Sequence, residues 1–324
     1  MFDQIQKRLL NQAELSFAEA LYLSRLEGRN FHRLLALSGQ ITGQRHQETI
    51  DLCSIINAKS GGCSEDCAFC AQAARYQTEI IHYELLSPEV ILSTARRVEA
   101  MGINRFSLVT SGKALSAREF DRIIDIYRLL KKQTRLKLCA SLGLLDYSRC
   151  CRLKEAGVTT YHHNLETAKS YFARICTSHS YEERVATIRA AQKAGLRVCS
   201  GGIISAGETM EQRIELAYEL KDLQVDSVPV NILNPIPGTP LEKQEMISVR
   251  EIIITLSLFR LILPNVTLRF AGGRKEALGE LRSLGFLAGI NGAIVGDFLT
   301  TPGDQISRDI ALIRDLGLKI APQS

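Results

Sequence analysis

Residues 99–111, EAMGINRFSLVTS, contain one complete transition from a helix to a strand. The helical pattern before them stops at Gly102, and glycine readily takes the left-handed conformation that closes a helix. The run that follows, RFSLVTS, is short and has the composition of a strand. KEAG (154–157) and QKAG (192–195) repeat this ending, and each leads directly into another strand-like run. The stretch therefore predicts one unit of a repeated helix–strand chain.

The same alternation covers most of the sequence. Helical patterns fill the gaps between eight strand-like runs, for example at 88–100, 116–132 and 209–223. Eight alternating units predict an α/β fold, a complete (β/α)8 TIM-type barrel. The eight runs are TIDLCSIIN (49–57), RFSLVTS (105–111), LKLCASL (136–142), TTYHHNL (159–165), LRVCSGG (196–202), DSVPVNIL (226–233), VTLRFAG (266–272) and NGAIVGD (291–297).

The first 48 residues contain no strand pattern. Ser16 and Glu19 have the spacing of a capping box, which predicts a helix beginning there. No low-complexity linker separates this region from the rest. We therefore expect a helical N-terminal extension over residues 1–48 and a barrel over residues 49–324.

Charge and hydropathy narrow the class of protein. The chain has 40 Lys and Arg against 35 Asp and Glu, and this excess of +5 is scattered, so we expect no nucleic-acid partner. The N-terminus lacks the apolar segment of a signal peptide, and no apolar run is long enough to span a bilayer. We therefore expect a cytoplasmic protein with no membrane partner.

Nine cysteines in such a chain favour metal or redox chemistry over a disulfide framework. An odd number would also leave one thiol outside any closed set of bridges. A lone cysteine is most often a small buried apolar residue. Cys150 and Cys151 lie in a predicted helix, where adjacent positions do not share a face, so we assign them to helix packing.

Strand alternation predicts which side chains face the lumen. One face of each strand packs on the helices and is apolar, while the other faces inward. Cys53, Cys139 and Cys199 then point inward from the first, third and fifth strands. Arg269 does so from the seventh, and alternate strands share one layer of side chains. These four residues either fill space or form a set of ligands.

The loop after the first strand contains SGGCSEDCAFCAQ (60–72), with three thiols and then no fourth. A structural zinc site needs four ligands, and the nearest candidate, His82, lies outside any usual spacing. Three thiolates suit a cubane iron–sulfur cluster whose remaining iron is open to a small molecule. Active sites of such barrels lie at this end of the strands. The candidate ligands are Cys63, Cys67 and Cys70, with the aromatic Phe69 before the last of them.

The segment CSEDCAFC resembles the signature of the radical S-adenosylmethionine superfamily. From about residue 45 to the C-terminus, the chain also resembles the biotin synthase family within it. The segments that carry this resemblance are SGGCSEDCAFCAQAARY (60–76), YHHNLET (161–167), YEER (181–184), VCSGGI (198–203), SVPVNIL (227–233), GTPL (238–241) and LTTPG (299–303).

The resemblance implies a reaction and its cofactors. Cys63, Cys67 and Cys70 would hold a [4Fe–4S] cluster whose open iron takes the amino and carboxylate groups of S-adenosylmethionine. One electron, from a donor such as flavodoxin or ferredoxin, would release a 5′-deoxyadenosyl radical that removes hydrogens from C9 and C6 of dethiobiotin. An auxiliary iron–sulfur cluster would supply the sulfur that completes biotin. The resemblance also implies a homodimer.

The resemblance assigns roles to further positions. Asn164 and Glu166 would contact cofactor and substrate, although the family commonly has Asp where this chain has Glu166. Arg184 would pair with the methionine carboxylate, which suits the planar guanidinium fork. Asn231 would contact substrate. The segment GGIISAGE (201–208) would offer a backbone edge to the adenine, with Gly201 and Ile203 as contact residues.

One departure from the family pattern affects the auxiliary cluster. Family members commonly have a cysteine on the second strand, and this chain has Ser107 there. Cys139, Cys199 and Arg269 match the other three ligands, and Cys53 is an additional inward thiol. Either the auxiliary cluster is lost and the product differs, or the fourth ligand has moved to Cys53. The cluster would then be [2Fe–2S] or a four-iron variant.

The remaining candidates have weaker signals. His162 and His163 are neighbours on a strand and face opposite sides, so we expect His162 inside and His163 outside. His179 shows no ligand spacing. Cys176 matches an aliphatic position of the family, and we assign it to the core.

Two other functions compete with sulfur insertion. One is a related radical enzyme of the hydrogenase-maturation or methylornithine type, disfavoured by SVPVNIL, GTPL and three of the four expected auxiliary ligands. The other is a non-catalytic iron–sulfur carrier or a zinc-stabilised binding module, disfavoured by the three-thiol loop and the inward ligand set.

Overall fold

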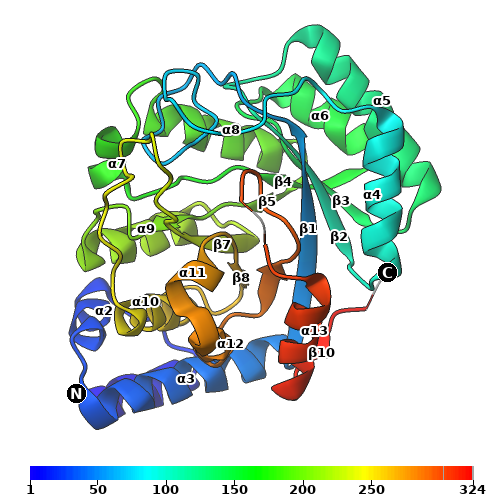
Figure 1. Cartoon of the computed structure of the whole chain (residues 1–324). Coiled ribbons are helices and arrows are strands. Elements are labelled where there is room, and N and C mark those ends of the chain that lie inside the picture. The colour runs from blue at the N-terminus through cyan, green and yellow to red at the C-terminus, as the bar shows by residue number, and fades with distance from the viewer. Residues whose placement is uncertain (302, 323–324) are drawn as a thin grey trace.

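The strands pair in parallel and close on themselves into a barrel (Figure 1). This computed structural model describes residues 1–301 and 303–322. Eight strand positions surround the lumen, and β9 pairs back with β1, so the predicted (β/α)8 architecture is confirmed. The barrel strands are β1 (Thr49–Lys59), β2 (Arg105–Thr110), β3 (Lys137–Ser141), β4 (Val158–His162), β5 (Arg197–Cys199) with β6 (Gly202–Ile204), β7 (Ser227–Ile232), β8 (Thr267–Phe270) and β9 (Gly292–Ile294).

The fifth strand position differs from the predicted run. It is two short strands, β5 and β6, that keep one register with β7, since Cys199 pairs with Ser227 and Gly202 pairs with Val230. The interruption lies at Ser200 and Gly201. The carbonyl oxygen of Gly201 instead accepts the backbone N–H groups of residues 165 and 166, at 2.9 and 3.1 Å. The predicted strand over 196–202 is therefore confirmed at residues 197–199 and 202 and interrupted at residues 200–201.

The helices cover the outside of the barrel, as the sequence pattern predicted (Figure 1). Gly102, Gly157 and Gly195 follow helix ends with φ of 84°, 105° and 76°, which confirms their role as helix stops. The helices are α4 (Pro88–Ala100), α5 (Ala117–Gln133), α6 (Tyr147–Glu155), α7 (Lys169–Ile175), α8 (Tyr181–Lys193), α9 (Met210–Asp222), α10 (Val249–Ile262), α11 (Arg274–Leu278), the 3₁₀ helix η1 (Gly279–Arg282), α12 (Ser283–Leu287) and α13 (Ile306–Asp315).

Three helices precede the barrel: α1 (Phe2–Leu10), α2 (Phe17–Ser24) and α3 (Gly28–His46). The capping box of Ser16 and Glu19 opens α2, as predicted. Helix α3 packs against α10 and α12, and the apolar residues of α1 to α3 join the core of the barrel (Figure 1). The domain boundary at residue 48 stays a prediction.

The C-terminal end adds an unpredicted strand. Strand β10 (Lys319–Ile320) pairs with Thr49 and Ile50 at the start of β1. In the LTTPG segment (299–303), Pro302 lies outside the described residues. No helix in the described part of the chain is long and apolar enough to cross a membrane.

Candidate active site

The three-thiol loop lies beyond the carboxyl end of β1. Cys63, Cys67 and Cys70 are free thiols and line one cavity of about 400 Å³ together with Phe69. The loop bonds to itself: the N–H of Cys63 donates to the Gln72 carbonyl at 3.0 Å, and that of Cys70 donates to the Cys67 carbonyl at 2.9 Å. The backbone therefore holds the three thiols at the mouth of the barrel.

Asp66 fixes this loop to the segment after α7. Its Oδ1 accepts the N–H groups of Thr177 and Ser178 at 2.9 and 3.0 Å. Burial alone would raise the pKa of this carboxyl, but the hydrogen bonds from Thr177 and Ser178 outweigh it and the pKa lies well below its usual value. The thiol loop is thus anchored by an ionised side chain.

Cys176 lies beside this loop, which the sequence did not suggest. It is buried, as a core residue would be, but its Sγ is 3.8 Å from Cys67 Sγ and 3.3 Å from His179 Nδ1. His179 also pairs with Glu65. The ligand atoms of Cys67, Cys176 and His179 all lie within 4.8 Å of one another. Because 109 residues separate the two cysteines, only the fold reveals the pair.

Arg184 organises the polar wall of the cavity. Its Nε donates to His179 Nε2 at 2.9 Å, and its Nη1 donates to the Asn164 carbonyl at 2.9 Å and approaches Glu166 Oε1 at 3.4 Å. Asn164 Nδ2 donates to Glu166 Oε2 at 3.3 Å. Burial raises the pKa of Glu166 despite the nearby Arg184. Glu166 has φ of 72°, an uncommon backbone conformation for a residue other than glycine.

The remaining predicted contacts are already hydrogen-bonded within the protein. Gly201 N–H donates to Asn164 Oδ1 at 3.2 Å, and Ile203 N–H donates to the Glu166 carbonyl at 2.7 Å. Asn231 lines the cavity, accepts the Gly272 N–H at 3.0 Å and donates to a backbone carbonyl at 3.3 Å. In the described chain, Gly201 and Ile203 are not among the residues that line the cavity.

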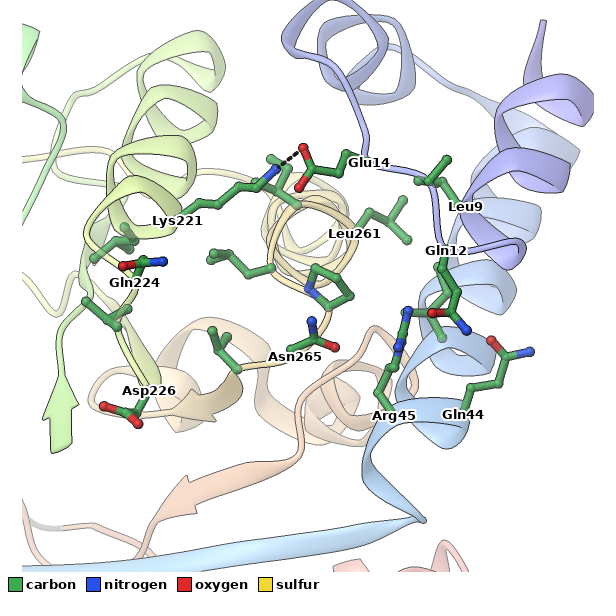
Figure 2. A pocket seen from close by; sticks show the side chains of 18 of the residues that line it. Leu9, Gln12, Glu14, Gln44, Arg45, Lys221, Gln224, Asp226, Leu261 and Asn265 are labelled. Carbon is green, nitrogen blue, oxygen red and sulfur yellow. Dashed lines mark ion pairs between the residues drawn. The ribbon is translucent and has the colours of Figure 1, made fainter.

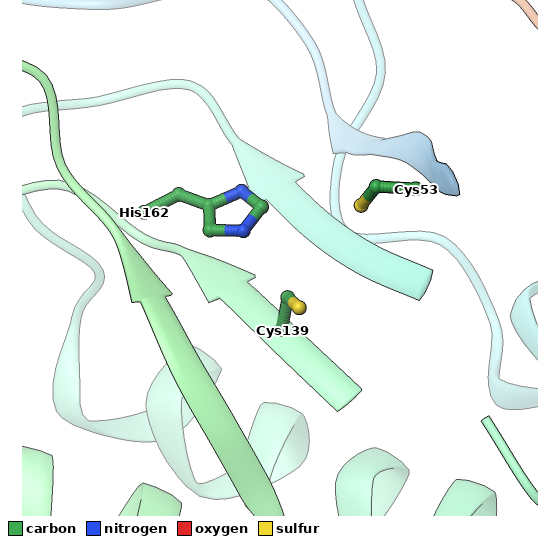
Figure 3. A group of neighbouring side chains, drawn as sticks. All are labelled: Cys53, Cys139 and His162. Atoms are coloured by element: carbon green, nitrogen blue, oxygen red, sulfur yellow. The ribbon is translucent and has the colours of Figure 1, made fainter. Parts of the chain in front are cut away.

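Deeper in the lumen, Cys53 from β1 and Cys139 from β3 face each other beside His162 of β4 (Figure 3). The ligand atoms of these three side chains all lie within 4.8 Å of one another. A hydrogen bond from Cys53 lowers the pKa of the Cys139 thiol, and His162 lowers it further. Cys199 of β5 is also buried and lines the same cavity as the three-thiol loop. The inward placement of Cys53 and Cys139 matches the strand alternation.

Arg269 projects from β8 into a salt bridge. Its Nη2 donates to Asp51 Oδ1 at 2.7 Å, its Nη1 to the Asp51 carbonyl at 3.0 Å and its Nε to Ser227 Oγ at 3.1 Å. Arg105 Nε donates to the same carboxylate at 2.9 Å. Burial would raise the pKa of Asp51, but Arg269 and Arg105 together hold it at about 2.

Two hydroxyl groups in this part of the lumen lack a partner. Ser107 pairs with Cys139 in the register of β2 and β3, and Thr160 pairs with Cys139 in that of β3 and β4. Among the described residues, both hydroxyls are buried without a hydrogen bond. Buried hydroxyl groups normally have a partner. Two orphaned donors around facing thiols therefore fit a sulfide-bearing cluster at this level of the barrel.

A second cavity lies at the opposite end of the barrel. It has a volume of about 470 Å³ and is lined by residues of α1, α3, α9 and α10, with Lys221 and Glu14 paired at 2.9 Å across it (Figure 2). Within the described chain, no predicted site residue lines it. The thiol-lined cavity is therefore the candidate active site.

Comparison with known proteins agrees with this geometry. Residues 58–220 match the family model of the radical SAM superfamily, and residues 229–319 match the Biotin and Thiamin Synthesis associated domain. The chain is thus a member of the radical SAM superfamily.

Curated relatives define the family within that class. Biotin synthase from Pelotomaculum thermopropionicum is 49% identical over 320 residues, covering 99% of this chain and 100% of the relative. Biotin synthase from Heliobacterium modesticaldum is 51% identical, covering 98% of this chain and 97% of the relative. The chain belongs to the biotin synthase family.

Solved structures show the same fold. A methylornithine synthase superposes with a TM-score of 0.86 at 21% identity, covering 98% of both chains. The FeFe-hydrogenase maturase HydG from Carboxydothermus hydrogenoformans gives 0.84 at 16% identity, covering 98% of this chain and 79% of its own. At this identity the similarity concerns the fold alone.

Proposed function

We propose that this chain converts dethiobiotin into biotin by inserting one sulfur atom, with S-adenosylmethionine and two iron–sulfur clusters as cofactors. One observation carries the proposal: a single cavity reaches both groups of cysteines, since Cys63, Cys67 and Cys70 line it at the mouth and Cys199 lines it deeper. When bound, the cofactors supply an organic radical and a sulfur atom. Identity of about half with biotin synthases favours this product over those of the related radical enzymes.

In this proposal the protein positions the cofactor with the polar wall of the cavity. Arg184 uses its Nε and one Nη for internal hydrogen bonds, and its Nη2 has no partner in the described chain. That group is available to a carboxylate, which favours the methionine end of S-adenosylmethionine there. Glu166 would accept a hydrogen bond from a ribose hydroxyl, and Asn231 would contact dethiobiotin.

We assign the auxiliary cluster to the lumen layer. Its ligands would be Cys139 and Cys199, with Cys53 in place of the cysteine that Ser107 replaces and Arg269 as the fourth group. The cluster would be [2Fe–2S] or a four-iron variant. A Cys53→Ala variant should lose iron from the second cluster and fall in biotin yield. A variant that keeps both would refute the relocation to Cys53.

The proposed reaction is tested on anaerobically purified, chemically reduced protein. With S-adenosylmethionine and dethiobiotin, we expect methionine, 5′-deoxyadenosine and biotin. A Cys70→Ala variant should form none of them. Cys151→Ala is the matched control, because Cys151 is a half-buried cysteine of α6 that lies outside the cavity lining. Cleavage without biotin would indicate another radical enzyme, and no cleavage would indicate a carrier.

The family also suggests the surroundings of the enzyme. The electron donor would be a flavodoxin or ferredoxin. The protein would be a cytoplasmic homodimer without a nucleic-acid partner. Residues 1–48 would form a helical extension, and residues 49–324 would form the barrel. Analytical ultracentrifugation tests the dimer, and electron transfer from a reduced flavodoxin tests the donor.

A further inference from the structure

We propose that His179 is a positioning residue for Arg184, and that it directs the guanidinium group towards the carboxylate of S-adenosylmethionine. Glu65 of the three-thiol loop holds His179 in place. This inference rests on the proposed function, since it concerns the binding of the cofactor in that reaction. It gives a role to a histidine whose sequence spacing suggested none.

The first argument is a chain of hydrogen bonds through the imidazole ring. Arg184 Nε donates to His179 Nε2 at 2.9 Å. A guanidinium nitrogen can only donate, so Nε2 is the acceptor of the ring and Nδ1 carries the proton. Nδ1 then donates to Glu65 Oε2, which also accepts the Ser178 hydroxyl at 2.8 Å. The ring therefore joins a carboxylate on one side to a guanidinium on the other.

The second argument is the packing around these side chains. Glu65, His179 and Arg184 are all buried. The Phe172 ring of α7 meets the His179 ring edge-on, with 5.8 Å between their centroids, and its centroid lies 5.7 Å from the guanidinium carbon of Arg184. Side chains that are fixed by both packing and hydrogen bonds can hold a binding group in one direction. The imidazole meets both conditions.

The third argument is the nitrogen that this arrangement leaves to a ligand. Arg184 uses Nε for His179 and Nη1 for the Asn164 carbonyl, and its Nη2 has no partner in the described chain. Because the guanidinium group is planar and rigid, the hydrogen bond at Nε also sets where Nη2 points. Arg184 lines the same cavity as the three thiols. Since Glu65 belongs to the loop of these thiols, the contacts tie the direction of Nη2 to the position of that loop.

The test measures binding of S-adenosylmethionine by anaerobic equilibrium dialysis, with the first cluster oxidised so that the cofactor is not cleaved. Two variants separate the two contacts of the ring. His179→Gln keeps an acceptor near the place of Nε2, whereas His179→Asn keeps only a donor near the place of Nδ1. We expect His179→Asn to bind the cofactor about tenfold more weakly, because a hydrogen bond to a charged group is lost. We expect His179→Gln to bind it nearly as well as the wild type.

His46→Asn is the matched control. His46 Nε2 lies 3.0 Å from Nη1 of Arg260, and in the described chain neither residue lines the cavity. This variant loses a contact of the same kind and should bind the cofactor as the wild type does. In an Arg184→Ala background, His179→Asn should weaken binding no further, since His179 acts through Arg184. A further loss in that background, or equal affinity of the two His179 variants, overturns the inference.

Iron analysis separates a positioning role from support of the first cluster. Loss of that iron in both His179 variants overturns the inference. If only His179→Asn loses the iron, the affinity of His179→Gln decides: binding close to that of the wild type supports the inference, and a clear loss of affinity overturns it.

The biotin assay separates this inference from the proposed function. If the wild type forms biotin and the two His179 variants bind the cofactor equally well, the positioning role alone is refuted. If the wild type cleaves S-adenosylmethionine without forming biotin, and only His179→Asn binds the cofactor weakly, the positioning role is supported and the product is refuted.

Discussion

The Asp51 carboxylate should contribute about 2 kcal/mol to stability, and Asp51→Asn tests this figure. The side chain is mostly buried and pairs with both Arg269 and Arg105. These partners lower the pKa of Asp51 from 3.8 to about 2. A shift of about two units corresponds to about 2 to 3 kcal/mol of differential stabilisation of the charged form. Asparagine keeps the shape but removes the charge that two buried cations need.

The assay is urea unfolding of the cluster-free, thiol-reduced protein at pH 7, followed by circular dichroism. The control is Asp125→Asn, because Asp125 pairs with Arg128 at 3.0 Å on the surface and is 75% exposed. Exposed pairs of this kind contribute less than about 1 kcal/mol. If both variants lose the same small amount, the buried pairs at Asp51 do not have the strength inferred here.

The low pKa of Asp51 also makes the stability of the protein depend on pH. A carboxyl whose folded pKa is depressed stabilises the protein fully above its unfolded pKa of about 4, and this contribution fades as the pH falls towards about 2. The difference between wild type and Asp51→Asn should therefore be the same at pH 7 and pH 5 and shrink below pH 4. A difference that already shrinks between pH 7 and pH 5 would contradict the assignment to Asp51.

Three further outcomes follow from the structure. Burial lowers the pKa of His46 to about 4, so the wild type should lose stability as the pH falls from about 6.5 to 4. In His46→Gln, the urea concentration at the unfolding midpoint should change less with pH over this range. Cys176→Ala should keep the iron of the first cluster by iron analysis, since its neighbour Cys67 remains; loss of that iron would make Cys176 a ligand. Gly201→Ala should lower the melting temperature markedly, because its new methyl group would overlap the carbonyl oxygen of Pro229, and an unchanged melting temperature would show that the strands shift apart freely.

Local chemistry explains the features that were predicted from the sequence. Helix stops at Gly102 and the capping box at Ser16 depend on residues a few positions apart, and both are confirmed. Strand alternation has a period of two, so it correctly turned Cys53 and Cys139 towards the same lumen. The three-thiol loop was recognisable because its three cysteines are close in sequence.

The features that were missed depend on distant segments. At the break between β5 and β6, the Gly201 carbonyl accepts the N–H groups of residues 165 and 166 in the segment after β4, and the strand pattern of residues 196–202 does not record that contact. Strand β10 consists of two residues and exists through its pairing with β1. The contact between Cys67 and Cys176 joins two loops that neither sequence pattern links.

The sequence by itself therefore determined the barrel, its family and the three-thiol loop, because each depends on spacing along the chain. Only the tertiary structure decided which partners share the lumen. In the folded barrel Arg269 pairs with Asp51, and His162 lies beside the thiols of Cys53 and Cys139. These contacts form because closure of the barrel places side chains from separate strands at one height. Distances between such side chains follow from strand register and stagger, which no single segment of the sequence specifies.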